Sequence, residues 1–272
     1  RFKNPFLNLN LFSKMEIKIL NKSQNKLVFS INGINAVLAN TLRRLMIMEV
    51  PVLAIDVVEF TKNSSALYDE IIAHRLGLLP LKTDLKSYNL KEECKCKGKG
   101  CALCELKLTL KKDGASMVYA SDLKSADPKV IPVYPEIPIV ELIKKQSLEF
   151  TATAILGKGK KHAKFCPGLV YYRGYPMFDV KDKSKLKKVE EELKDVITVK
   201  NDNITIKDIS KWNESHEEIL EINNVEINNS KENFVFFIES WGQLKPEEIV
   251  KKSLEIFDEK LDEFSEKLKK AK

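Results

Sequence analysis

Near the start of the chain, apolar and polar positions alternate. MEIKIL at 15–20 and KLVFSI at 26–31 alternate on either side of the polar stretch NKSQN, and Asn32-Gly33 follows as a turn signal. A period of two residues is typical of strands that bury one face, and Asn-Gly favours tight turns. The pattern therefore predicts a β-hairpin in this region.

The next apolar positions change to helical spacing. Leu38, Leu42 and Leu45 lie three or four residues apart, and further apolar positions extend this stripe in both directions. Such a stripe indicates an amphipathic helix, and Pro51 ends it because proline disrupts a helix interior. The β-branched run VLAIDVVEF that follows predicts a strand.

Farther along, short β-type runs are separated by turn residues and charged loops. A short helix is expected at 68–77, where Gly77 ends it. The other expected elements are strands at 105–112, 147–156 and 233–242, a strand or loop at 169–176, a surface helix at 181–196, a loop with extended pieces at 125–140, and short strands with turns between 197 and 230. This mixture predicts the α+β class.

The chain closes with a long helical pattern that starts at Pro246, a residue that suits the first turn of a helix. Its apolar positions alternate between spacings of four and three residues, at Val250, Leu254, Phe257, Leu261, Phe264 and Leu268. This heptad spacing makes a narrow apolar seam that suits packing along another helix. Ile249 and Ile256 add a second apolar flank, so the helix can serve both its own core and a partner.

Composition sets limits on size and on partners. The 272 residues suffice for one large domain or two modest ones, and a hydrophobic content of 43% is ordinary for a globular protein. The net charge of +7 is compatible with a nucleic-acid neighbourhood, but a lysine-rich solvated surface is the favoured explanation. No run approaches the ~18 apolar residues that a membrane span needs.

Residues 1–14 precede the first alternating segment. They are basic and partly apolar, and they lack the features of a secretory signal. We expect an N-terminal extension with little structure, in a protein of the cytoplasm, where thiols stay reduced.

Four of the five cysteines lie in the short stretch CKCKGKGCALC, at Cys94, Cys96, Cys101 and Cys104. In a reducing compartment such a cluster favours a metal over disulfides, and four thiolates suit tetrahedral zinc. The intervening glycines let the backbone bend back, and the lysines favour thiolates. We expect a structural zinc site, because four protein ligands leave no position for a reacting water; a reduced, metal-free loop and a redox centre are the alternatives.

The other candidate groups carry weaker signals. Cys166 could act as a nucleophile with His162, although a small buried side chain is the commoner role of a lone cysteine. The basic stretch GKGKKHAK at 157–164 could contact nucleic acid or an acidic surface, but it lacks P-loop spacing. The sequence has no serine-hydrolase, dinucleotide-binding or carboxylate–metal motif, so we expect no active site of its own.

Five stretches taken together point to a family. They are ANTLRRLMIMEVPVLAIDVVEF at 39–60, IIAHRLGLLPL at 71–81, the cysteine loop, ILGKGKKHAKFCPGLVYY at 155–172 and FIESWGQLKPEEIVKKSLEIFDEKL at 237–261. In this order they resemble the D-type subunits of archaeal DNA-directed RNA polymerase, the third subunit of eukaryotic RNA polymerase II and, more distantly, the amino-terminal part of the bacterial alpha subunit. The resemblance covers the chain from about residue 15 to its end.

The resemblance implies a fold and a role in transcription. The fold would be a discontinuous dimerisation domain of sheet plus helices, at 15–55 and 223–272, interrupted by a mainly β insert domain at 56–222 that carries the zinc loop at 94–104. The role would be a non-catalytic assembly subunit of DNA-directed RNA polymerase, a nucleotidyltransferase complex. The chain would pair with the smaller subunit L as a platform for the two large catalytic subunits, with subunits N and P nearby. DNA would be met only through the complex, and no membrane is implied.

The resemblance also implies site residues. Leu38, Leu42, Arg43 and Arg44 would lie on the helix that faces the platform, and the seam of the last helix would serve both core and dimer interface. The four clustered cysteines match the family's zinc ligands. Many archaeal relatives hold an iron–sulfur cluster on an insert after YYRGYP, but residues 173–272 contain no cysteine, so no such cluster is expected.

Two other hypotheses compete with this one. An independent zinc-containing protein that binds nucleic acid would explain the net charge and the basic stretch, and it predicts salt-dependent binding to DNA or RNA. A thiol enzyme using Cys166 and His162 is a third hypothesis. A stable one-to-one complex with a subunit L would distinguish the assembly subunit from both.

Overall fold

The computed structural model describes residues 15–271, so the expectation for residues 1–14 lies outside the described residues. The chain divides into two compact units. Among the described residues, the first combines 15–43 with Val170–Glu239, and the second combines Arg44–Leu169 with 240–271. Both mix helices with sheets, which confirms the expected α+β class. The domain boundaries expected from the sequence stay a prediction.

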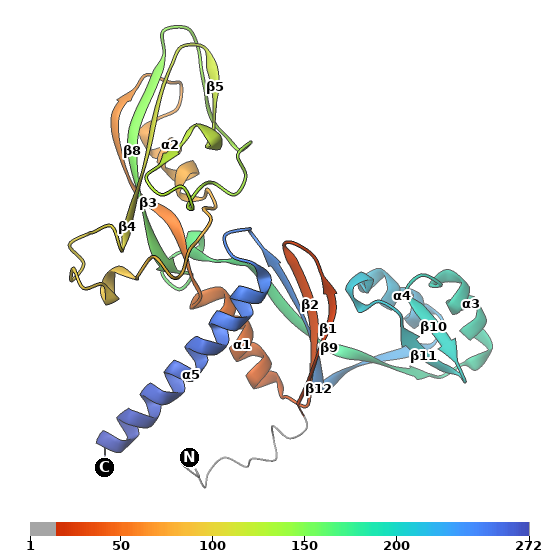
Figure 1. Ribbon diagram of the computed structural model, residues 1–272. Coiled ribbons are helices and arrows are strands. Elements are labelled where there is room, and N and C mark those ends of the chain that lie inside the picture. Colours follow the sequence, from red (N-terminus) through yellow and green to blue (C-terminus); the bar gives the residue numbers. More distant parts are fainter. Residues whose placement is uncertain (1–14, 272) are drawn as a thin grey trace. The chain divides into compact units, whose positions relative to one another are not determined.

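The first unit is built on a four-stranded sheet from both ends of the chain. Its strand order is β1 (Glu16–Lys22), β2 (Lys26–Asn32), β12 (Val225–Ser240) and β9 (Gly168–Val180). β1 and β2 form the expected hairpin, and β12 pairs antiparallel with β2 (Figure 1). Phe29 lies opposite Phe236 in this pairing, and their rings stack with centroids 5.2 Å apart. The late strand thus packs its aromatic side chains beside those of the early hairpin.

The same unit contains a small region of helices and a β-hairpin. The region comprises α3 (Leu186–Glu192), β10 (Ile197–Lys200), β11 (Asn203–Ile206) and α4 (Glu214–Ile222). Val189, Ile197 and Leu220 are fully buried in its hydrophobic core. The same core includes Val28 and Val235 of the four-stranded sheet, so the small region packs onto that sheet.

Two secondary-structure expectations for this region are wrong. The surface helix expected at 181–196 is limited to α3, which follows a 3-10 turn at Lys183–Lys185. α4 is a helix where only strands and turns were expected. Asn213 caps it by accepting the backbone N–H of His216. The apolar residues of α4, Ile219, Leu220 and Ile222, all lie at its C-terminal end, so no helical spacing marks the segment.

The second unit holds a larger sheet with a core of its own. The strand order is β3 (Pro51–Asn63), β8 (Ser147–Lys158), β4 (Glu105–Asp113) and β6 (Lys124–Ser125). A separate two-stranded sheet pairs β5 (Ser116–Tyr119) with β7 (Pro138–Leu142). A short helix, α2, spans Asp69–Gly77. Leu108, Phe150 and Ile72 share the core, which joins the sheet to α2. The strands expected at 105–112 and 147–156, and the helix that Gly77 ends, are confirmed.

Two longer helices are α1 (Ala36–Met48) and α5 (Pro246–Lys270), and both confirm helices expected from apolar spacing. The boundary between the two units falls within α1. At the start of α5, the Glu248 carboxylate accepts the backbone N–H of Lys245 at 2.8 Å, which caps the first turn. No helix in the described part of the chain combines the length and the apolar character that a membrane crossing demands.

Candidate metal centre and partner surface

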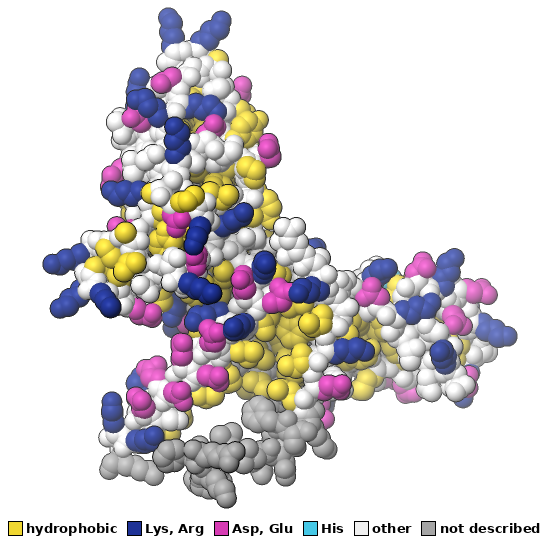
Figure 2. All heavy atoms as spheres, viewed as in Figure 1, with side chains coloured by type: hydrophobic (Ala, Val, Ile, Leu, Met, Phe, Trp, Pro, Cys, Tyr) yellow, Lys and Arg dark blue, Asp and Glu magenta, His cyan; other side chains and the backbone are white. Residues whose placement is uncertain are grey.

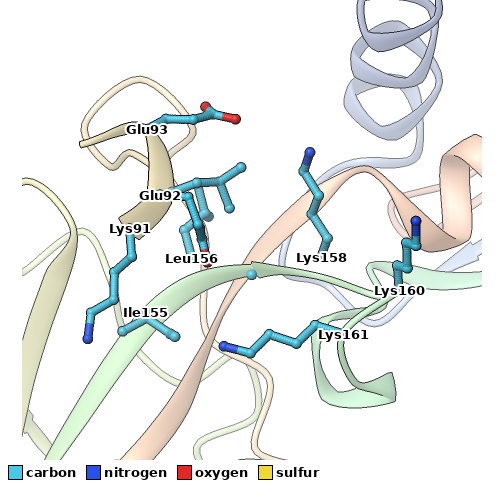
Figure 3. Close-up of a pocket in the computed structure, with 10 residues that line it drawn as sticks. Lys91, Glu92, Glu93, Ile155, Leu156, Lys158, Lys160 and Lys161 are labelled. Atoms are coloured by element: carbon cyan, nitrogen blue, oxygen red, sulfur yellow. The ribbon is translucent and has the colours of Figure 1, made fainter. Parts of the chain in front are cut away.

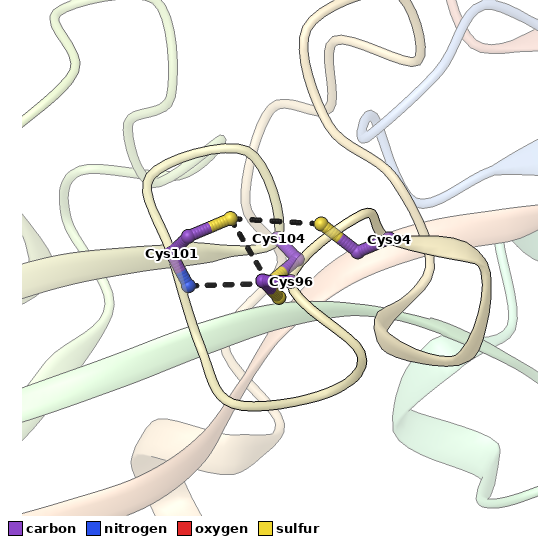
Figure 4. A group of neighbouring side chains, drawn as sticks. All are labelled: Cys94, Cys96, Cys101 and Cys104. Atoms are coloured by element: carbon purple, nitrogen blue, oxygen red, sulfur yellow. Dashed lines mark hydrogen bonds between the residues drawn. The ribbon is translucent and has the colours of Figure 1, made fainter.

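The four clustered cysteines converge on one point. Cys94 and Cys96 follow a 3-10 turn, η1 (Lys91–Glu93), and Cys101 and Cys104 precede β4. Their Sγ atoms all lie within 4.8 Å of one another (Figure 4). The Sγ separations are 3.5 Å for Cys94–Cys101, 3.6 Å for Cys96–Cys104 and 3.8 Å for Cys101–Cys104. The structure thus brings together the residues that the sequence singled out.

Left-handed backbone conformations fold the cysteine loop back on itself. Lys97, Gly98 and Gly100 have φ values of 54°, 79° and 88°, a region that glycine enters at little cost. At the second cysteine pair, Cys104 Sγ accepts the backbone N–H of Cys101 at 3.4 Å. Such N–H groups aimed at sulfur favour the thiolate form, which is the form that binds metals.

An ion pair joins the segment that enters the loop to the strand that leaves it. Lys91 Nζ lies 2.6 Å from Glu105 Oε1, and both side chains are partly buried. The hydrogen bond from Lys91 to this carboxylate is the main cause that raises the pKa of the lysine. A Cβ at Gly100 would lie 2.5 Å from a carboxylate oxygen of Glu105, so a larger residue there would displace this carboxylate from its position beside the loop.

The thiol arrangement fits a tetrahedral metal. Zinc bound by four thiolates at about 2.3 Å places neighbouring sulfurs about 3.8 Å apart, close to the observed separations. All four cysteines are free thiols, and the distances between their sulfur atoms are well above the S–S bond length of about 2.05 Å. Burial raises the pKa of Cys104 to about 12. Burial would also raise the pKa of Cys96, but hydrogen bonds with Cys94 and Cys104 lower it to about 6. The loop can therefore hold a metal ion with protein sulfur at every position.

Two of the four lysines in the basic stretch at 157–164 pair with the protein's own carboxylates. Lys164 Nζ lies 2.8 Å from Asp56 Oδ1, and Lys158 Nζ lies 3.5 Å from Glu49 Oε2. On the face that Figure 2 shows, basic and acidic side chains are interspersed. Independent nucleic-acid binding needs lysines that are free to contact phosphates, so these pairings disfavour that hypothesis.

Cys166 and His162 do not have the arrangement of a catalytic pair. His162 Nδ1 accepts the backbone N–H of Lys164 at 3.0 Å, which stabilises the turn. Burial raises the pKa of the Cys166 thiol, so the thiol stays protonated. A catalytic cysteine must instead react as the thiolate. Both observations disfavour the thiol-enzyme hypothesis.

Most of the apolar seam on α5 is open to solvent. Its exposed fractions are 44% for Leu254, 48% for Leu261, 61% for Phe264 and 52% for Leu268. Val250 and Phe257 are half-buried, whereas Ile249 and Ile256, on the second apolar flank, are buried. The helix thus divides its apolar positions between a covered stripe and an open one.

The candidate residues on α1 differ in their surroundings. Leu42 is buried and Leu38 is half-buried. Arg43 donates to Asn40 Oδ1 through Nη2 at 2.9 Å and through Nε at 3.1 Å, so its side chain is held against the helix. Arg44 is exposed. Of these four side chains, Arg44 is therefore the one most open to a partner.

Comparison with known proteins shows which family the chain belongs to. Residues 55–166 match the family described as RNA polymerase Rpb3/RpoA insert domain. The chain is 39% identical to DNA-directed RNA polymerase subunit Rpo3 of Pyrococcus horikoshii, over 94% of this chain and 98% of that relative. This chain belongs to the Rpo3 family.

Further relatives give the same result. Identity is 38% to subunit Rpo3 of Thermococcus kodakarensis, over 94% of this chain and 98% of the relative. It is 36% to subunit Rpo3 of Archaeoglobus fulgidus, over 92% and 96%. Rpo3 is another name for the D-type polymerase subunit, so the resemblance noted in the sequence is confirmed, as is an insert domain of the Rpb3/RpoA type.

Sequence reasoning missed one carboxylate that connects three segments of the second unit. Glu49, whose side chain is 15% exposed, pairs with Lys158 at 3.5 Å and with Lys260 at 3.3 Å. It thereby links the end of α1 to β8 and α5. No local pattern marks Glu49, because its two partners lie far from it in the sequence.

Proposed function

We propose that this chain is the non-catalytic assembly subunit of an archaeal DNA-directed RNA polymerase. It pairs with the smaller subunit L, and the pair forms the platform for the two large catalytic subunits. Membership of the Rpo3 family supports the polymerase role. The observation that carries the pairing is the open apolar seam of α5. Subunits N and P are proposed as neighbours, and DNA as a contact made only through the complex.

The end of α5 supports a partner on energetic grounds. Every residue from Leu261 to Lys270 is exposed. A helical stretch of this length has little stability in water by itself. Burying the exposed halves of Leu261, Phe264 and Leu268 would contribute on the order of 1 kcal/mol each. A partner helix with a matching seam would supply this burial, which is what the heptad spacing suits.

We assign the platform contact to α1 and the partner contact to α5. The exposed guanidinium of Arg44 supports a polar contact with a large subunit, and Leu38, Leu42 and Arg43 share its helix. In domain terms, we place the dimerisation domain at 15–55 and 223–272 and the insert at 56–222. The insert-family match, which begins at residue 55, supports the first of these boundaries.

The metal that we propose for the cysteine loop is zinc. Four thiolates at tetrahedral separations suit it, and with no ligand position left for water its role is to cross-link the two cysteine pairs. Thiolate ligands stay reduced in the cytoplasm, where we place the protein. We expect no iron–sulfur cluster, since residues 173–272 contain no cysteine.

Co-expression with the subunit L of the same organism tests the pairing. The two chains are expected to elute together from gel filtration as a one-to-one complex, whereas this chain alone aggregates or associates with itself through the open seam. An unrelated small helical protein with the same tag serves as the control and should not co-elute. A monodisperse monomer that ignores subunit L would argue strongly against the proposal.

A further inference from the structure

Glu49 lies in a tightly connected part of the second unit. It directly follows α1, and the connection after β8 is bonded to the same helix end, because the Lys160 N–H donates to the Met48 carbonyl at 3.0 Å. A Cβ at Gly159 would collide with the backbone carbonyl of Ile47, so the chain passes here too close for a side chain. The Glu49 carboxylate is therefore carried by a backbone position that two segments hold in place.

Two lysines from other elements meet this carboxylate. Lys158 Nζ, at the end of β8, lies 3.5 Å from Glu49 Oε2, and Lys260 Nζ of α5 lies 3.3 Å from Glu49 Oε1. The Glu49 side chain is only 15% exposed, so water screens these attractions less than at an open surface. Figure 3 shows Lys158 on the opposite side of the β8 ribbon from Lys161. Without the carboxylate, Lys158 and Lys260 would lose the anion that they share and would repel each other.

Lys260 marks the end of the covered stripe of α5. Ile249, Ser253 and Ile256 are buried at spacings of four and three residues, and Lys260 follows four residues later on the same face of the helix. Every residue from Leu261 to Lys270 is exposed. The ion pair is therefore made where the covered part of the helix ends and the exposed part begins.

A small tilt of α5 at this point would be amplified along the exposed part. At a rise of about 1.5 Å per residue, Lys270 lies about 15 Å beyond Lys260, so a tilt of about 15° would move the end of the helix by about 4 Å. Phe264 and Leu268 of the open seam belong to this part. In a helix seam each side chain inserts into a hole on the partner helix, so such a displacement would misalign the two helices. Fixing the helix before the partner arrives lowers the cost of binding.

We propose that Glu49 is a positioning residue for the partner surface: its ion pairs with Lys158 and Lys260 hold α5 in the orientation in which the open seam meets the partner helix. The inference rests on the proposed pairing with subunit L. Glu49 itself does not contact the partner in this role, because it acts through Lys260. A neutral amide at this position would not attract either lysine as an anion does, so the exposed part of α5 would sample other orientations.

Calorimetric titration of the full chain with subunit L tests the proposal. Glu49→Gln is expected to weaken pairing about fivefold or more, the scale of one partly buried ion pair. Glu59→Gln is the matched control and should pair within about twofold of the unchanged chain, since Glu59 is exposed and makes no ion pair within residues 15–271. Residual dipolar couplings of backbone amides measure the angle between α5 and β3 in the unbound chain. This angle should change in Glu49→Gln and stay the same in the control.

A double-mutant cycle separates positioning from a general loss of stability. Lys260→Gln breaks the same ion pair from the more exposed side, so the double variant with Glu49→Gln should weaken pairing by clearly less than the product of the two single effects. The proposal is overturned if Glu49→Gln pairs within about twofold of the unchanged chain, if the two effects simply multiply, or if the angle of α5 stays the same. An unchanged chain that does not bind subunit L would contradict the pairing itself, and this inference with it.

Discussion

Single residues set the behaviour of the cysteine loop. Cys104 is fully buried, and its sulfur contacts both Cys96 and Cys101. A serine hydroxyl at this position is a poor ligand for zinc, because it does not ionise as a thiol does. Losing one of four ligands also opens the site to water.

Cys104→Ser is therefore expected to lower zinc affinity by more than roughly 100-fold, beyond the effect of losing an outer-shell contact. Inductively coupled plasma mass spectrometry should find about one zinc ion per chain in the purified unchanged protein and little zinc in the variant. Cys166→Ser is the matched control, because Cys166 lies outside the cluster. A Cys104→Ser chain that keeps a full equivalent of zinc would falsify the four-thiolate assignment.

A partly buried ion pair attaches the basic stretch to β3. Lys164 Nζ lies 2.8 Å from Asp56 Oδ1 and also donates to the backbone carbonyl of Ile55 at 3.1 Å. Burial would raise the pKa of Asp56, but the hydrogen bond and charge of Lys164 outweigh it, so the pKa lies below its usual value. A lowered carboxylate pKa contributes stability above the unfolded pKa of about 3.9, and this stability is lost as the pH falls through the folded pKa.

Lys164→Met is expected to lower the free energy of unfolding by about 2 kcal/mol at pH 7, between the values typical of exposed and buried pairs. The difference from the unchanged chain should stay constant down to about pH 4 and shrink below it. Urea denaturation at neutral and acidic pH measures it, with the exposed Lys144→Met as control. A difference of the same size at both pH values would mean that lost packing, and not the ion pair, causes the effect.

At the scale of elements, α5 shows two stripes with different roles. Its buried stripe includes Ile249, Ser253 and Ile256, and its open stripe includes Leu261 and Phe264. Because the open stripe has no cover in the described chain, changing it should leave folding intact. Changing the buried stripe should not.

Leu261→Asp is expected to preserve the fold and weaken pairing with subunit L by about 3 kcal/mol, roughly 100-fold in Kd, because it would place a charge in an apolar interface. Ile256→Asp should instead destabilise the chain itself. Circular dichroism reports folding, and titration with subunit L reports pairing. Glu259→Ala, changed off the seam, is the control and should pair normally. Normal pairing by Leu261→Asp would show that the seam is not the interface.

For the whole molecule, stability depends on assembly if the open seam is a subunit contact. A partner that binds only the folded chain stabilises it by an amount that grows with partner concentration. Family membership and the exposed apolar positions both point to such a partner. The stability of this chain alone is then lower than its stability in the polymerase.

The melting temperature should therefore rise with added subunit L. At a subunit L concentration of 100 times the Kd, linkage predicts about 2.7 kcal/mol, which corresponds to roughly 5–10 °C for a chain of this size. Differential scanning fluorimetry over a series of subunit L concentrations measures it; the Leu261→Asp chain is the control and should respond only at about 100-fold higher concentrations. A melting temperature that is independent of subunit L would count against the linkage.

Local sequence patterns predicted many of the elements of this structure. Alternation marked the β1–β2 hairpin, the three-to-four spacing marked α1 and α5, and the spacing of the cysteines marked the loop whose sulfurs meet within 4.8 Å. These signals are strong because the interacting residues are close in sequence or repeat along one element. α4 was missed because its apolar residues lie only at its C-terminal end, at 219–222, and so show no helical spacing.

The sequence by itself determined the elements with a clear period, the cysteine cluster and the family. Tertiary structure decided which half of the α5 apolar surface is covered, the pairing of β12 with β2, and the ion pairs that engage Lys158 and Lys164. Each of these depends on contacts between segments far apart in the chain. A local pattern shows that a residue is apolar or charged, but only the folded chain decides what lies against it.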